Sequence, residues 1–538
     1  MIRVLLVLLV IGVSSTVSAN DRLAGSAHNS DHAPALQNKY KKKAKSGKNT
    51  DILDSFAQIE GLGLRENIYE GGLGRDLWDK TRRSEVTALL DLAPVHHNDA
   101  VVQDLVKGVL LSTTTTRKIE NDVDDVQAGD DLLTLRLRKL NEMGAYQDAF
   151  TLYTKITDAP YHPRLIEQGI VAMILSGQKS LACVEARSAA EIFASDAFLT
   201  HLITLCDANW SKEAINTAIG EIESLKGFKS ALLVATHSVA PLSLSVDKAL
   251  KLPPRDVWPA LIHEGVSPSV SAALSVRAYE LGLMSLADLE ETYERSDERK
   301  ADLDIAALYR DFNAAEGGER WRIFSKALAL QKTYGTAGLA PFAGGLNTPE
   351  LLDSPTNRDL SRIYAIFMRA NKKIPEKLFT ALLDKDHDRK DVDLYGKLLT
   401  IAALSTPNMQ KRISYINKLE KIIEETTPQT QFRIENTLSV AREMGHFKKD
   451  TKTSYENNLF LTFPLTYVIH SANTNKRLVE ATQSARRGEV ALLSIIVLNA
   501  RNEELLYPEH LRNTLIGLSE VGLNNVARRV AVAGLLSN

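Results

Sequence analysis

The sequence predicts an all-α protein, an irregular solenoid of helical hairpins arranged in two segments. From Asp51 onward, apolar residues recur at helical spacing in almost every stretch. Glycine repeatedly separates two such stretches, as expected where one helix ends and the next begins. Aromatic residues make up 6% of the 538 residues, while leucine and alanine dominate, which favours closely packed helices.

The clearest hairpin runs from Leu140 to Tyr153. Gly144 can adopt the left-handed conformation that ends a helix. The small Ala149, five residues later, lets the two helices approach closely. Other turns repeat the pattern with or without the alanine: Gly177 with Ala182, Gly282 with Ala287, Gly522 with Ala527, and the lone Gly445 and Gly488.

Two intervals between these turns have the length of a two-helix repeat. Gly144 and Gly177 are 33 residues apart, and Gly488 and Gly522 are 34 apart. The hairpins at Gly144 and Gly522 resemble tetratricopeptide repeats in their turn glycine and the small residue after it. This TPR-like resemblance implies a degenerate solenoid in which each hairpin buries its apolar face against its neighbours.

Other segments resemble a group of uncharacterised bacterial secreted helical-repeat proteins. They are LWDKTRRSEVTALLDL (residues 77–92), ACVEARS (182–188), LCDANW (205–210) and GLNNVARRVAVAGLL (522–536). The resemblance implies a helical fold and an exported chain. It implies no catalytic or binding residue.

Residues 1–19 are expected to be a signal peptide. Arg3 precedes an apolar run, and small residues lie before a cleavage site after Ala19. The run is too short to span a bilayer, although an uncleaved anchor remains the alternative. We therefore expect an exported chain that starts at Asn20, has no transmembrane span after cleavage, and lies in the periplasm or outside the cell.

Residues 20–50 are expected to form a disordered basic tether. Lys39 to Lys48 is rich in lysine, which suits either a solvated linker or contact with anionic lipid or cell wall. His28, Asp31 and His32 could bind a metal ion only weakly, because a tether gives them no fixed geometry. We predict no metal site and no cofactor.

The first half also contains a histidine turn and an acidic loop. His96 and His97 follow Pro94 and are expected to be exposed in that turn. The acidic residues from Asn121 to Asp131 fail as an EF-hand, because Gln127 and Leu133 replace the required Gly and Glu. Asp130 or Asp131 is instead expected to cap the next helix.

The two cysteines, Cys183 and Cys206, are 23 residues apart, which suits facing positions on successive helices. In an oxidising compartment we expect a disulfide, which would add roughly 3 kcal/mol of stability. Two buried free thiols are the alternative. The lack of CxxC spacing argues against a catalytic thiol pair.

Helical units are expected at 165–175, 181–193, 198–205, 212–225, 270–281 and 286–293. Pro253, Pro254 and Pro259 should break the helical pattern near Trp258. The Gly- and Pro-rich stretch from Lys332 to Pro355 is expected to divide the chain into helical-repeat segments 51–345 and 346–538. Residues 455–470 suit a buried helix or, alternatively, a partner groove.

His263 to Leu286 resembles the active-site stretch of lytic transglycosylases. In that family a glutamate, here Glu264, protonates the glycosidic oxygen. Gly265 replaces the family's serine and Ser285 its glutamine, and Gly282 to Met284 is already explained as a hairpin turn.

Composition and motifs together favour an exported, non-enzymatic scaffold that binds a protein, a peptide or a cell-wall partner. A net charge of −2 argues against general nucleic-acid binding. The sequence has no Gly-rich phosphate loop, HExxH or GxSxG motif. The alternatives are a lytic-transglycosylase-like enzyme acting on peptidoglycan and an accessory chaperone of an envelope machine.

Overall fold

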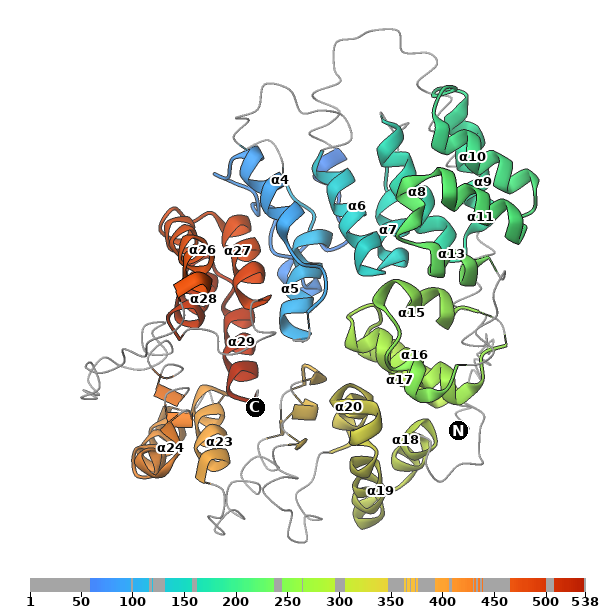
Figure 1. Ribbon diagram of the computed structural model, residues 1–538. Coiled ribbons are helices and arrows are strands. Elements are labelled where there is room, and N and C mark those ends of the chain that lie inside the picture. The colour runs from blue at the N-terminus through green and yellow to red at the C-terminus, as the bar shows by residue number, and fades with distance from the viewer. Residues whose placement is uncertain are drawn as a thin grey trace, which may run out of the picture.

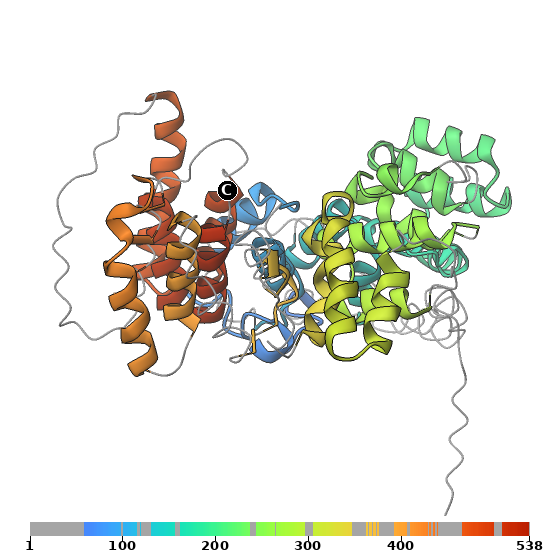
Figure 2. The ribbon, with the colours of Figure 1, turned by 90° about the horizontal axis from the view of Figure 1, so that it is seen from below.

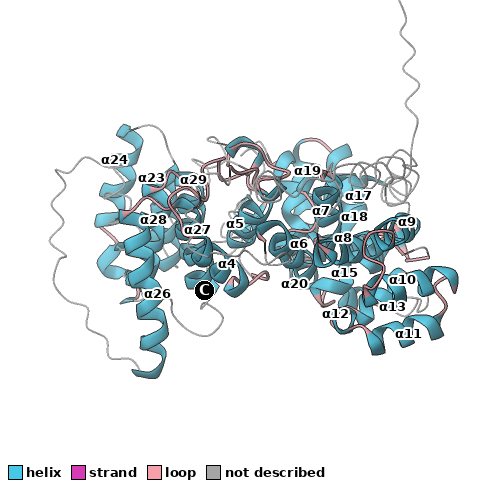
Figure 3. Ribbon diagram, turned by 90° about the horizontal axis from the view of Figure 1, so that it is seen from above, coloured by secondary structure: helices cyan, strands magenta, loops and turns pink. Residues whose placement is uncertain are grey.

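A computed structural model gives the architecture of the chain. It describes residues 59–97, 100–115, 119, 131–156, 162–236, 244–263, 265–295, 305–346, 392–405, 409–428, 465–499 and 508–536, with parts of 362–375 and 430–438. Within these ranges the protein is all-α and has no strand, as predicted (Figure 3). The predicted signal peptide, the cleavage site after Ala19 and the basic tether lie outside them.

The helices of the first half follow one another as hairpins. The opening group is η2 (Ile68–Glu70), α4 (Arg83–Leu92), α5 (Ala100–Leu111), α6 (Leu132–Met143) and α7 (Tyr146–Thr154). The next group is α8 (Pro163–Leu175), α9 (Lys179–Ala190), α10 (Ala197–Asp207), α11 (Lys212–Glu221), α12 (Glu223–Lys226) and α13 (Lys229–Ala235).

The remaining helices form two further groups. The middle group is α14 (Val246–Ala249), α15 (Pro254–Leu261), α16 (Pro268–Glu280), α17 (Leu286–Arg295), α18 (Ile305–Ala314), α19 (Gly317–Ala329), α20 (Gln331–Leu339) and η4 (Ala340–Gly345). The last group is α23 (Val392–Ser405), α24 (Met409–Glu420), η5 (Ile423–Glu425), α26 (Leu465–Gln483), α27 (Arg487–Asn499), α28 (Pro508–Glu520) and α29 (Asn524–Leu536).

The superhelix closes on itself. The chain runs from α4 through the green and yellow helices to the red ones, which return to the side of α4 and α5 (Figure 1). α27 packs against α4 and α5, and α29 packs against α5. The view from below shows the same return of the red helices to the blue ones (Figure 2). The first and last described hairpins are therefore neighbours.

Two helices lie inside this arrangement. In α5, every residue from Val101 to Leu111 except Asp104 is buried. In α27, every residue from Gly488 to Ile495 is buried. Burial on nearly all sides, which includes polar residues such as Lys107 and Glu489, places both helices in the core rather than at a surface. Through α5 and α27, the first and last groups of described helices pack together.

Helix ends follow local sequence signals. The Asp131 carboxylate accepts hydrogen bonds from the backbone N–H and the hydroxyl of Thr134, at 2.9 and 2.7 Å, and so caps α6 as predicted. Gly144 closes the same helix with a φ of 83°. Pro163 begins α8, where its missing N–H costs nothing.

Two expectations about Pro and Gly need correction. Pro253 and Pro254 do separate two helices, because α14 ends at Ala249 and α15 begins at Pro254, but Trp258 and Pro259 lie inside α15, so Pro259 does not break the helix. The stretch from Lys332 starts as packed helix, in which Tyr334 and Phe342 are buried, and η4 ends at Gly345. The rest of the expected boundary, residues 347–355, lies outside the described residues. The division into two segments stays a prediction.

Candidate functional site

The glycines of the predicted turns lie between successive helices. Gly144, Gly177, Gly282 and Gly522 all have positive φ, from 69° to 90°. At Gly144 a Cβ atom would lie 2.5 Å from the carbonyl oxygen of Pro254, so the turn also contacts α15 closely. Gly445 lies outside the described residues.

The small residues that follow these turns behave differently from one another. Ala149 and Ala182 are fully buried, and Ala527 is 1% exposed. Ala287 is exposed, so the expected close approach at this position is wrong. The side chain that α17 buries here is Leu289, two residues later.

Gly488 is not the turn residue that the sequence suggested. It lies in the first turn of α27, and the left-handed conformation belongs to Ala485, with a φ of 52°. A Cβ atom at Gly488 would lie 2.4 Å from Cε3 of Trp78. Its N–H donates to the carbonyl oxygen of Leu77 at 2.8 Å. Glycine is required here because α27 crosses the Leu77–Trp78 backbone at contact distance.

Cys183 and Cys206 form the predicted disulfide, which joins α9 to α10. Their Cα atoms are 5.9 Å apart. The bond therefore fastens one helix of a hairpin pair to the next.

Several candidate residues fall outside the described part of the chain: Glu264, His28, Asp31, His32, and the Lys39–Lys48 run. Nothing in the structure bears on a catalytic role for Glu264. Within the described residues, no group of three or more His, Cys, Asp or Glu side chains could hold a metal ion.

His96 and His97 are not exposed, contrary to expectation. His97 is 8% exposed, and its N–H donates to Oε1 of Gln103 at 2.8 Å. Nε2 of His96 lies 3.2 Å from the carbonyl oxygen of Glu142, the acceptor at the end of α6. Burial lowers the pKa of the His96 imidazole, and the nearby Arg255 and Arg277 lower it further. The His96–His97 turn therefore lies against α6, and the hydrogen bond from His97 to Gln103 also connects it to α5.

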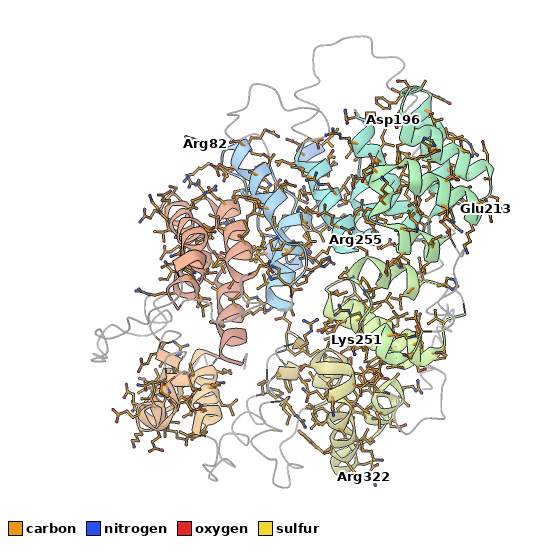
Figure 4. All side chains as sticks on the ribbon, viewed as in Figure 1. Arg82, Asp196, Glu213, Lys251, Arg255 and Arg322 are labelled. Carbon is orange, nitrogen blue, oxygen red and sulfur yellow. A yellow bond between two sulfur atoms is a disulfide. The ribbon has the colours of Figure 1, made fainter. Side chains whose placement is uncertain are left out.

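Arg255 and Tyr146 join the α6–α7 turn to α15. Pro259 has no N–H, which leaves the carbonyl oxygen of Arg255 without its helical donor. The Tyr146 hydroxyl donates to that oxygen at 3.0 Å. Arg255 donates to the carbonyl oxygen of Glu142 at 3.4 Å and lies over the Phe228 ring. Arg255 lies near the middle of the molecule, whereas Arg322 lies at its lower edge (Figure 4).

The polar face of α5 meets the α16–α17 turn. Nζ of Lys107 donates to the carbonyl oxygen of Gly282 at 2.8 Å and pairs with Asp148 at 2.6 Å. One turn earlier on α5, Asp104 accepts from Nη2 of Arg529 in α29 at 2.8 Å. α5 thus connects α7, the α16–α17 turn and the last described helix.

A fourth segment reaches the same place. The Tyr279 hydroxyl of α16 donates to the carbonyl oxygen of Arg369 at 2.6 Å, and Arg369 donates back to the carbonyl oxygen of Tyr279 at 2.9 Å. Lys372 pairs with Glu290 of α17 at 3.0 Å. We call Asp104, Tyr279, Glu290, Arg369, Lys372 and Arg529 the central junction.

A buried ionic cluster at the first helices escaped the sequence analysis. Glu60 is 1% exposed and makes a two-pronged ion pair with Arg83, at 2.6 and 2.7 Å. Arg136, also 1% exposed, donates to backbone carbonyl oxygens of the 60–62 segment and of α5. Their partners lie up to 76 residues away, so no local pattern could reveal them.

No ligand site follows from the cavity between the first helices and α27. A cavity of about 10 Å³ between α4, α5, α6 and α27 is apolar and too small for a ligand. No described helix combines the length and the apolar character needed to cross a membrane.

No protein-family model, no curated protein and no solved structure matches the chain significantly.

Proposed function

We propose that the protein is an exported, non-enzymatic helical scaffold that binds a protein, a peptide or a cell-wall polymer of the envelope in the periplasm. The observation that carries the proposal is the stacking of helical hairpins into a superhelix whose ends pack together through α5 and α27. Such an arrangement gives a fixed platform with a large outer surface.

The charged side chains in the interior support a scaffold. Lys107, Arg136 and Arg255 each donate to backbone carbonyl oxygens and so hold helices in place. A charged side chain whose N–H groups donate to backbone carbonyl oxygens can fix the positions of the helices it connects. Catalytic groups, in contrast, must be free to exchange protons with a substrate.

The outer helices offer the binding surface in this proposal. The α16–α17 turn contacts α5 at Gly282, where a Cβ atom would lie 3.1 Å from Gln103. A partner therefore gains access more easily to the exterior than to the space beside α5. Among the described helices, α10 and α11 have exposed faces, and Figure 4 labels Asp196 just before α10 and the exposed Glu213 on α11.

A crosslinking pull-down tests the proposal. The mature chain from Asn20 to Asn538 is crosslinked in an envelope extract of the source cell, and its partners are identified by mass spectrometry. We expect one strongly enriched envelope component. The control is Gly144→Val, which forces a side chain into the Pro254 carbonyl oxygen and disrupts the α6–α7 turn. Enrichment should be lost in this variant.

The competing enzyme function predicts a different result. Wall fragments recovered without a protein partner, together with peptidoglycan turnover that disappears in Glu264→Gln, would contradict the scaffold. Equal capture by the wild type and Gly144→Val would show that the binding does not depend on the fold.

A further inference from the structure

The central junction brings together two arginines from distant parts of the sequence. Arg529 pairs with Asp104 of α5 at 2.8 Å, and Arg369 donates to Tyr279 of α16 at 2.9 Å. The two pairs are adjacent because Lys107, one turn from Asp104, contacts Gly282, one turn from Tyr279. Both arginines and Asp104 also act on the pKa of the Tyr279 phenol.

Each guanidinium group has N–H donors that these hydrogen bonds do not use. Arg529 and Arg369 each use Nη2 for the bond just described. In both side chains Nε is buried and has no hydrogen-bond partner among the described residues. A buried N–H donor of this kind can take a water molecule or an ion as a further partner.

The charges of the junction do not balance. Arg369, Arg529 and Lys372 are cationic, and Asp104 and Glu290 are the facing carboxylates. Burial raises the pKa of the Tyr279 phenol to about 12, so this group is neutral at physiological pH. Among these described residues the cations outnumber the carboxylates by one, and Arg369 lies over the Tyr279 ring, 4.9 Å from its centroid. An excess of positive charge in a partly buried position favours an anion as a further partner.

We infer that Arg369 and Arg529 form a site for a tetrahedral oxyanion, either inorganic phosphate or a phosphate monoester. Guanidinium groups suit such ligands because their planar donors pair with two oxygens at once. A bound anion would link α16, α29 and the segment around Arg369. This inference does not depend on the proposed function.

Thermal unfolding of the full mature chain tests the site. Inorganic phosphate and glycerol 3-phosphate are titrated separately, with chloride adjusted to keep the ionic strength constant. We expect the melting temperature of the wild type to rise by roughly 1 to 4 °C at saturation. A rise with both ligands identifies phosphate itself as the ligand, and a rise with glycerol 3-phosphate alone identifies an esterified phosphate.

Variants localise the effect. Arg529→Gln and Arg369→Gln should each weaken the apparent affinity by about tenfold or more, and Arg529→Lys should keep part of it. Arg322→Gln is the matched control, because Arg322 forms an ion pair with Glu319 on the surface of α19, at 2.6 Å, away from the central junction. No rise in the wild type, or an equal rise in both glutamine variants, would overturn the inference. Because the wild-type result stands alone, the test survives if a variant fails to fold.

Discussion

Arg136 stabilises the first helices more than any surface charge can. Its guanidinium donates to the carbonyl oxygens of Leu110 at 2.7 Å, Leu62 at 2.7 Å and Ser112 at 3.0 Å. Burial lowers its pKa to about 10, so it stays charged at neutral pH. We expect Arg136→Met to lower the free energy of unfolding by about 3 to 5 kcal/mol, because buried acceptors lose their donors. Denaturant unfolding of the mature chain measures this.

Arg138 on the same helix is the control. Its side chain is 38% exposed and pairs with Asp91 at 2.6 Å. Exposed ion pairs contribute little, so Arg138→Met should change the free energy of unfolding by less than about 1 kcal/mol. Comparable losses in the two variants would contradict the role assigned to Arg136.

His96 should make stability depend on pH. Burial lowers its pKa, with Arg255 and Arg277 acting in the same direction, while the carbonyl oxygen and carboxylate of Glu142 oppose them. As the pH falls through about 6.5, the unfolded chain binds a proton at His96 that the folded chain does not. The contribution of His96 to stability is therefore present above that pH and is lost below it.

The test compares unfolding of the wild type and His96→Gln between about pH 7.5 and about pH 5. The variant should lose less stability on acidification than the wild type does. Thr200→Ala, at an exposed position of α10, changes no titratable group and is the control, which should keep the wild-type slope. A wild-type slope in His96→Gln would show that His96 does not carry this dependence.

At the residue scale, the sequence allowed us to predict contacts between residues that are close together in the chain. Asp131 caps α6 through a residue three positions later, and the pattern predicted it. His96 was expected to be exposed because its partner, the carbonyl oxygen of Glu142, lies 46 residues away. Arg529 reaches Asp104, 425 residues away, and Arg369 reaches Tyr279, 90 residues away, only through the fold. Contacts between distant segments leave no mark in a single sequence.

At the element scale, the disulfide joins α9 to α10. Removing it with Cys183→Ser and Cys206→Ser should lower the free energy of unfolding by about 3 kcal/mol, because the unfolded chain regains the entropy of an open loop. Hydrogen exchange should rise mainly in α9 to α11. The reduced wild type is the matched control and should behave like the double variant. Unchanged exchange in α10 would contradict a fastening role for the bond.

Helix positions were more predictable than helix contacts. The expected unit at 165–175 corresponds to α8, and that at 286–293 lies within α17. The unit at 212–225 divides at Ile222, whose backbone is extended between α11 and α12. Pro259 stays helical because the Tyr146 hydroxyl replaces the missing backbone donor. Such compensation comes from another helix, which periodicity cannot reveal.

At the scale of the whole molecule, the main feature is that α27, near the end of the chain, packs against α4 and α5. Arg487, at the start of α27, pairs with Asp76 at 2.6 Å and donates to the carbonyl oxygen of Val521 at 2.9 Å. Arg477 of α26 pairs with Glu85 of α4. The fold shows that α5 and α27 pack against each other, a contact between segments almost 400 residues apart that the sequence analysis did not predict.

Hydrogen exchange of the mature chain tests this closure most directly, using Gly488→Ala. The new methyl group would meet Trp78, so α27 should separate from α4 and α5. We predict that exchange rises together in α4, α5 and α27, because they open as one unit. Gly220→Ala, on the outer face of α11 with open space around it, should leave all three unchanged. Faster exchange in α27 while α4 and α5 keep wild-type protection would contradict a scaffold closed by its two ends.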